Sequence, residues 1–434
     1  MSDERETKRA PAVRPFGFWT ATALVVGGMI ASGIFMIPAA LAPFGWSGVL
    51  AWAISIGGVL AIAFTLARLA QTMPEASGAI AVTGAVLGEL PGVLVGWSYW
   101  VSVWAANAAI AIAAASYVEV LVPGLRSTSI GGAALAVGII WALTLLNLGG
   151  ARMAGRFQVV TTLLKLLPLL AVIVIAATIW LDDGRSPLPP AGTAMTGLAA
   201  AVALTLFPLV GFESAGIAAE RVRDPARTIM RATMVGTFVT GLLYVLVCSA
   251  IVLILPSSEL AASQAPFQLF VERFWGYGAA VAVAAFAAIA AIGALNGWVL
   301  IQGEVPLGMA RAGLLPGWFG RTSARDVPVR VLIAASTLAS LLVWFNSSKS
   351  LSGVFAFAAL LTTCASLWLY LAICVSALIR RVAMPAAVVG TGFALFAFWG
   401  AGAQASGLSL VLMLTALPVY WLRPRSAGTA IPHS

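Results

Sequence analysis

Two short stretches of sequence decide the fold expected for this chain. Residues 27–35 read GGMIASGIF, and residues 207–216 read FPLVGFESAG. Each stretch lies within a long apolar run, the first over residues 17–41 and the second over 196–219. Glycine and proline weaken a helix at mid-membrane and free backbone N–H and C=O groups to bind something. Close packing of helices through small residues is the alternative for either stretch taken alone.

The rest of the chain is built from similar apolar runs. Of its 434 residues, 61% are hydrophobic and only 9% are charged. Soluble domains carry about 25% charged residues, so ordinary cytosolic enzymes, nucleic-acid-binding modules and disordered chains are excluded. Twelve runs are long enough to cross a bilayer as helices. They cover residues 17–41, 47–70, 91–122, 130–149, 156–181, 196–219, 228–255, 276–303, 328–345, 351–379, 384–402 and 405–422.

The basic residues predict how these spans are oriented. With the N-terminus in the cytoplasm, 19 Lys and Arg residues fall on the cytoplasmic side and 4 on the other, with Lys165 inside a span. Such an asymmetry is typical of membrane proteins, and it accounts for the net charge of +9 without nucleic acid. We therefore expect a multi-pass protein of the cytoplasmic (inner) membrane with both termini in the cytoplasm. The first run is predicted to be a retained span, not a signal peptide.

The interrupted runs are the first and the sixth, which are matching positions in two halves of five spans. This arrangement favours a transporter built from inverted repeats. The predicted fold is an all-α polytopic membrane protein of twelve transmembrane helices. Broken helices 1 and 6 belong to a 5+5 inverted-repeat core, and two further helices are peripheral. The expected segments are a cytoplasmic tail (1–15), the first repeat (16–181), the second repeat (195–379), the peripheral spans (384–422) and a second cytoplasmic tail (423–434).

Four motifs carry a resemblance to a known family. They are IASGIF (30–35), GFES (211–214), VRDPAR (222–227) and MARAGLLP (309–316), and they occur in the family's order over spans one to nine. On these motifs the chain resembles the amino acid–polyamine–organocation superfamily, and within it the basic amino acid and polyamine antiporters of the arginine/agmatine type. The resemblance implies a secondary active transporter of amino acids or related amines and polyamines that works by alternating access. It further implies independence from sodium, exchange or proton-coupled uptake, and a homodimer formed through the last two spans. No cofactor or metal ion is expected.

The resemblance also implies a substrate site. Ala31, Ser32 and Gly33 should hold a carboxylate at a helix N-terminus, while the backbone carbonyls of Met29, Phe207 and Val210 should hold an ammonium group. Ser102, Asn107 and Trp298 match positions that line the substrate side chain, with core packing as the alternative for Trp298. Phe207 stands where the arginine-binding member has tryptophan, so the bound side chain stays open.

Two charged residues lie inside predicted spans, where each costs about 2.5–3.5 kcal/mol on insertion scales. We expect Glu213 to face a cavity or a partner and to respond to protons; a neutral acid that bonds two helices is the alternative. By resemblance it lies on the cytoplasmic path, near Tyr99. Lys165 stands, again by resemblance, where sodium-coupled relatives bind an ion, with snorkelling to the membrane surface as the alternative. The family's gating tyrosine on span ten is expected to be replaced by Trp368.

Other classes of membrane protein fit the sequence poorly. A membrane enzyme needs paired acids, a nucleophile with a base, or metal ligands, but the chain has one histidine, in its C-terminal tail, and three cysteines inside apolar runs. A channel needs a polar ring along its pore, and no repeated filter is visible. The phosphate-binding pattern of ATP-driven pumps is absent. The sequence thus predicts a transporter and no enzyme, but not its substrate or its direction of transport.

Overall fold

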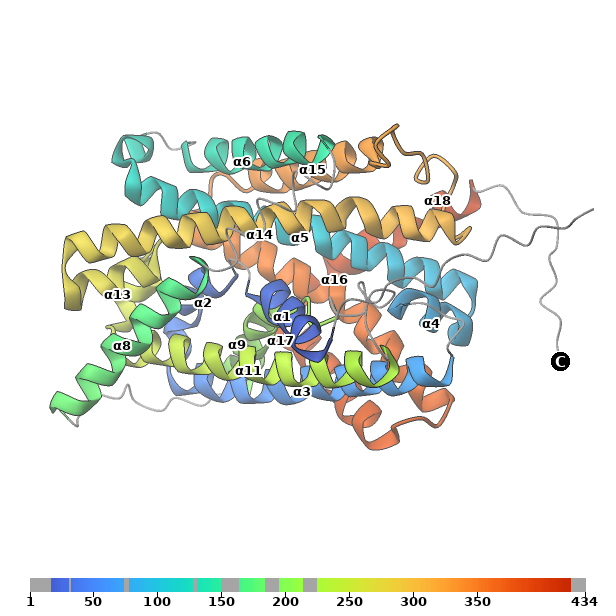
Figure 1. Ribbon diagram of the computed structural model, residues 1–434, viewed down its shortest axis with the longest axis horizontal. Coiled ribbons are helices and arrows are strands. Elements are labelled where there is room, and N and C mark those ends of the chain that lie inside the picture. Colours follow the sequence, from blue (N-terminus) through green and yellow to red (C-terminus); the bar gives the residue numbers. More distant parts are fainter. Residues whose placement is uncertain are drawn as a thin grey trace, which may run out of the picture.

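The computed structural model describes residues 17–30, 33–73, 78–127, 131–149, 164–183, 195–213 and 225–422, and Figure 1 shows their helices. The α-helices are α1 (Phe18–Met29), α2 (Gly33–Leu41), α3 (Trp46–Thr72), α4 (Ala79–Leu87), α5 (Glu89–Leu121), α6 (Gly131–Leu148), α8 (Leu166–Asp183), α9 (Met195–Leu206), α11 (Pro225–Ile254), α12 (Ser257–Ala262), α13 (Pro266–Trp275), α14 (Tyr277–Arg311), α15 (Val329–Phe345), α16 (Leu351–Ile379), α17 (Met384–Leu414) and α18 (Ala416–Trp421). Short 3-10 helices are η1 (Ala42–Phe44), η2 (Pro123–Ser127) and η3 (Phe207–Leu209).

Many of these helices are long and apolar enough to cross a membrane. Within the described residues there are 7 such helices, or 8 if α1 and α2, which differ in direction by 50°, form one bent span. The expectation of an all-helical membrane protein is therefore confirmed. The count of twelve spans stays a prediction, since the runs 156–181 and 196–219 extend beyond the described residues. The last two predicted runs fall largely on α17, whose backbone leaves the helical conformation at Gly402, with φ of +79°.

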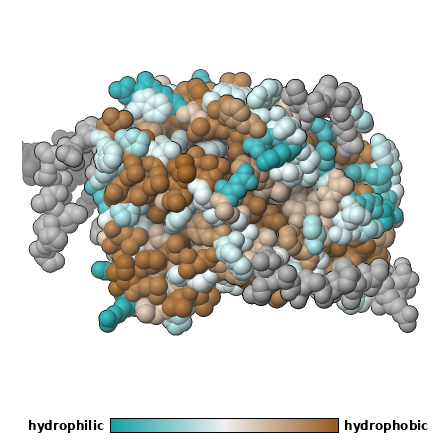
Figure 2. Space-filling view, turned by 180° about the vertical axis from the view of Figure 1, so that it is seen from behind, coloured by the Kyte–Doolittle hydropathy of each residue, from teal (hydrophilic) through white to brown (hydrophobic). Residues whose placement is uncertain are grey.

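Helix α5 forms the centre of the bundle and packs against α14 and α16 (Figure 1). In its most apolar window 94% of the residues are buried, against 33% in α6. Around this centre, α6 packs with α15, and α11 packs with both α1 and α3. The outer helices expose large apolar side chains, among them Trp180, Phe238 and Trp399. Figure 2 shows apolar residues spread over much of one face, as expected for a surface in contact with lipid.

Helix α17 is held against the core by close contacts at glycines. A Cβ atom on Gly400 would lie 1.9 Å from the backbone oxygen of Ala199 in α9. One on Gly58 of α3 would lie 2.2 Å from the ring of Phe393 in α17. Because lipid-exposed helices associate through small residues that allow close approach, these contacts fix α17 against both α3 and α9.

Candidate functional site

Two segments lose their helical hydrogen bonding in the interior of the bundle. Helix α1 ends at Met29, and Ile30 has φ of −69° and ψ of 73°. In the other segment, η3 ends at Leu209, Val210 is extended, and Gly211 has φ of +105°. Only glycine adopts such a φ without strain. The helical conformation therefore ends before Gly211, but the broken helices 1 and 6 stay a prediction, because Ala31, Ser32 and the residues directly after Glu213 lie outside the described residues.

The two segments contact each other. A Cβ atom on Gly211 would lie 3.4 Å from the backbone oxygen of Gly28 and 3.2 Å from the Trp298 ring. A Cβ atom on Gly33, at the start of α2, would lie 2.8 Å from the ring of Phe207. Glycines at these positions thus allow the ends of α1, α2 and η3 to meet beside α14.

A small cavity lies where these ends meet. Its lining includes five of the predicted site residues, namely Met29, Gly33, Phe207, Val210 and Trp298, together with Ala106, Ile110, Pro208 and Thr362. The cavity volume is about 10 Å³, which holds about one water molecule. The hydroxyl of Thr362 is fully buried and has no hydrogen-bond partner among the described residues. The sequence analysis did not single out Thr362.

Two predicted site residues do not line this cavity. Ser102 donates its hydroxyl hydrogen bond to the backbone oxygen of Tyr99, at 2.6 Å. Asn107 donates to Gln302 Oε1, at 2.7 Å, and Gln302 donates in turn to Ser336 Oγ, at 2.8 Å. Ser336 also shares a 2.7 Å hydrogen bond with Thr144. This chain of four side chains joins α5, α14, α15 and α6, so Asn107 serves the packing of the bundle in this structure.

Three hydrogen-bond donors converge on the carboxylate of Glu213. Tyr99 of α5 donates to Oε1 at 2.5 Å, and the backbone N–H of Gly211 donates to Oε2 at 3.2 Å. Tyr370 of α16 lies 3.4 Å and 3.3 Å from the two oxygens. The predicted proximity of Tyr99 and Glu213 is confirmed. The cluster links α5, α16 and the segment that follows η3.

Tyr370, two residues after Trp368, is the aromatic residue of α16 that lies at Glu213. The indole N–H of Trp368 donates instead to Ser409 of α17, at 3.1 Å, and its ring lies 4.8 Å from that of Phe398. Residues two apart on a helix point about 200° away from each other. Trp368 therefore faces α17 while Tyr370 faces the interior.

Side-chain donors cover the carbonyl end of α1. Lys165 is only 2% exposed, and its Nζ donates to the backbone oxygen of Gly27 at 3.2 Å. Tyr244 of α11 donates to the backbone oxygen of Met29 at 2.7 Å. The last carbonyls of a helix have no partner inside it, and a cation is favourable at that end. The buried ammonium of Lys165 rules out snorkelling in this structure.

Helix α16 carries an aromatic contact and a contact to the Glu213 cluster on either side of Thr362. Phe355 packs on Phe207 with ring centroids 5.7 Å apart. Thr362 lies seven residues after Phe355 and eight before Tyr370. At 1.5 Å per residue, these separations are about 10 Å and about 12 Å along the helix. Along α16, Thr362 of the cavity lining thus lies between the Phe207–Phe355 pair and the Glu213 cluster.

Comparison of the sequence with known proteins identifies the family of this chain. The chain matches the family of amino acid permeases over residues 16–430. It is 31% identical over 350 residues to the cadaverine/lysine antiporter of Escherichia coli (strain K12), which covers 79% of this chain and 77% of that protein. It is 28% identical over 340 residues to the putrescine transporter PotE of the same strain, covering 77% and 76%. The chain therefore belongs to the amino acid permease family of membrane transporters.

Proposed function

We propose that this protein is a secondary active transporter that exchanges amino acids or related amines across the cytoplasmic membrane by alternating access. The observation that carries the proposal is the meeting of two non-helical segments, after Met29 and after Leu209, at one buried cavity. Free backbone groups at such a place can bind a zwitterion without any charged side chain.

The two ends of a substrate find different partners in this arrangement. Helix α2 begins at Gly33, and the family resemblance assigns the substrate carboxylate to residues 31–33 at the N-terminus of this helix. The ammonium group would bind the backbone carbonyls of Met29, Phe207 and Val210, and it would share the oxygen of Met29 with the hydroxyl of Tyr244. Trp298 and Phe207 flank the substrate side chain, and an aromatic face also attracts a cationic group. The unpaired hydroxyl of Thr362 offers a further polar contact.

Transport then requires the cavity to open toward one side at a time. A volume of about 10 Å³ is too small for an amino acid, so α1, α2 and η3 must separate from α5, α14 and α16 on binding. Breaking the Glu213 cluster opens one side, and parting of Phe207 from Phe355 opens the other. Glu213 and Tyr99 thus act in gating, together with Tyr370.

Lys165 supports the proposal that sodium is not required. Its ammonium already lies against a carbonyl at the end of α1, where a bound cation would otherwise satisfy the free backbone oxygens. Gain and loss of a proton on this side chain offers a route for coupling to the proton gradient.

The finer architecture belongs to the same proposal. We infer twelve spans with both termini in the cytoplasm, inverted repeats over 16–181 and 195–379, and peripheral spans over 384–422. The homodimer implied by the family resemblance is formed through those last spans. The helical break at Gly402 supports two spans in the last segment.

Counterflow in proteoliposomes tests this function. Vesicles loaded with unlabelled lysine, arginine, cadaverine or putrescine are diluted into the same labelled compound, with sodium present or replaced by choline. These compounds are chosen because relatives are antiporters of cadaverine and lysine and a transporter of putrescine. We expect accumulation of label with at least one of them and no effect of sodium. Absence of counterflow for these and for a wider amino acid panel contradicts the proposal.

A further inference from the structure

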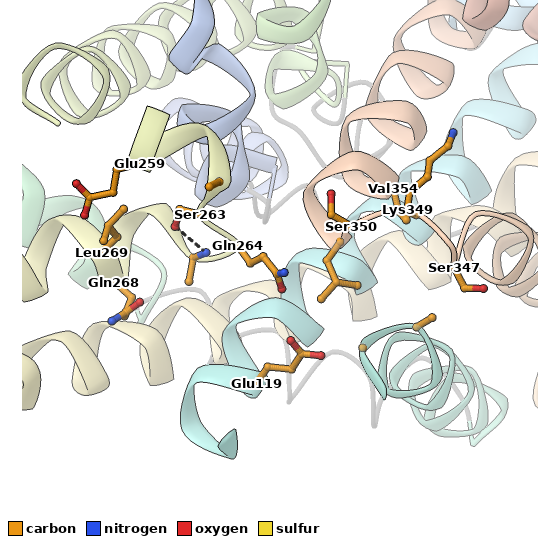
Figure 3. Close-up of a pocket in the computed structure, with 15 residues that line it drawn as sticks. Glu119, Glu259, Ser263, Gln264, Gln268, Leu269, Ser347, Lys349, Ser350 and Val354 are labelled. Atoms are coloured by element: carbon orange, nitrogen blue, oxygen red, sulfur yellow. Dashed lines mark hydrogen bonds between the residues drawn. The ribbon is translucent and has the colours of Figure 1, made fainter. Parts of the chain in front are cut away.

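A second and larger cavity lies at one end of the helix bundle (Figure 3). Its volume is about 560 Å³, within the range of about 300–1,000 Å³ found for ligand sites. We call it the outer cavity; it lies between the end of α5, the first turn of α6, the α12–α13 segment and the connection from α15 to α16. The orientation inferred from the basic residues puts this end opposite the cytoplasm.

A buried carboxylate forms part of the wall of the outer cavity. Glu119 of α5 is 5% exposed. A Cβ atom on Gly132 would lie 2.6 Å from its Oε1, so the carboxylate lies against the first turn of α6. The positive end of that helix favours a negative charge there. Figure 3 shows Gln264 facing Glu119 across the cavity.

The other charged residues of the lining are exposed. Glu259 forms an ion pair with Arg273, with 2.5 Å between Oε2 and the guanidinium nitrogen. Lys349, on the opposite side of the cavity in Figure 3, has its Nζ 4.6 Å from the centre of the Phe357 ring. Glu119 therefore supplies the buried negative charge, and Lys349 is a positive charge at the rim.

An aromatic pair lies between the outer cavity and the central one. Leu351 and Val354, in the first turn of α16, line the outer cavity. The next residue, Phe355, packs on Phe207, which lines the central cavity. A molecule that leaves the central cavity toward this end of the bundle passes between these two rings into the outer cavity.

We propose that the outer cavity is a second binding site, which captures the ammonium group of an amino acid or a diamine at Glu119 before the molecule reaches the central cavity. The proposal rests on the proposed transport function for the identity of the ligand, and on the lining of the cavity for its location.

Protection of an introduced cysteine tests the proposal. Cys248, Cys364 and Cys374 are all buried, so a Ser347→Cys variant places a reactive thiol in the lining against a low background. The full-length protein is labelled in nanodiscs with a water-soluble thiol reagent, with lysine or cadaverine added as probe. We expect the probe that supports counterflow to slow labelling several-fold.

Replacement of the carboxylate identifies its role. In the double variant Ser347→Cys/Glu119→Gln, the probe should no longer protect the cysteine from labelling. Counterflow should continue because the central cavity is unchanged, but with a raised KM for the substrate. Gly132→Ala, which displaces the carboxylate, should also weaken protection. Glu272→Gln is the matched control, since Glu272 is exposed on α13 and lies outside the lining; it should retain protection.

The results separate this inference from the proposed function. Two results overturn the second site and leave the transporter proposal intact. One is counterflow without protection of Ser347→Cys, and the other is protection that is undiminished in Glu119→Gln. Protection that depends on Glu119 in a protein without counterflow supports the second site and contradicts the transporter proposal. Equal loss of protection in Glu272→Gln shows a general surface-charge effect and overturns the assignment to Glu119.

Discussion

The hydrogen bonds at Glu213 set a measurable preference for the closed cavity. Tyr99 lies 2.5 Å from Oε1, whereas the nearer oxygen is 3.3 Å from Tyr370. A hydrogen bond to a charged group contributes about 1.5–3 kcal/mol, and an ordinary one about 0.5–1.5 kcal/mol. Each 1.4 kcal/mol is a factor of ten. Tyr99→Phe should therefore raise the open population about 10- to 150-fold, and Tyr370→Phe about 2- to 12-fold.

The labelling rate of a cysteine in the central cavity measures this population. Thr362→Cys provides the thiol, since Thr362 lines the cavity and the native cysteines are buried. In nanodiscs, where both ends of the protein are accessible, labelling should be fastest with Tyr99→Phe and intermediate with Tyr370→Phe. Tyr277→Phe, at the exposed start of α14, is the matched control and should leave the rate unchanged. A larger effect from Tyr370→Phe than from Tyr99→Phe, or no effect from either, would refute the reasoning.

Three further substitutions have definite expected outcomes. Gly211→Ala forces a side chain into a backbone with φ of +105°, at about 1–3 kcal/mol, so the thermal midpoint and counterflow should both fall; an unchanged midpoint contradicts this. Lys165→Met keeps the length of the side chain but removes the donor to Gly27, and should abolish counterflow in sodium-free buffer; normal flux there shows that the ammonium is not needed. Gln302→Leu leaves Asn107 and Ser336 without a shared partner, which should cost about 1–3 kcal/mol and lower the thermal midpoint in detergent.

Some site residues could be named from the sequence because their signal is local. Glycine and proline inside an apolar run mark an interruption whatever surrounds them, and Gly211 has the positive φ that the interruption requires. A charge inside a span is equally conspicuous, and both Glu213 and Lys165 make the buried contacts that such charges need.

Other site residues gave no local signal. Thr362 lies in an apolar helix, where a threonine can equally bond the carbonyl one turn earlier. Gln302 forms the centre of a chain of four side chains from four helices, and no spacing in the sequence relates those residues. Trp368 and Tyr370 are both aromatic and two residues apart, so the sequence could not tell which of them faces Glu213.

The sequence by itself determined that the chain crosses a membrane as helices and which of its apolar runs contain residues that weaken a helix, because hydrophobicity and backbone freedom are properties of each segment. Only the tertiary structure decided which side chains meet at the interruptions. The rotation of each helix depends on packing against segments that are distant in the chain, as where Gly211 comes to lie between Gly28 and Trp298. The tertiary structure also revealed the outer cavity, because the residues that line it come from four separate regions of the sequence.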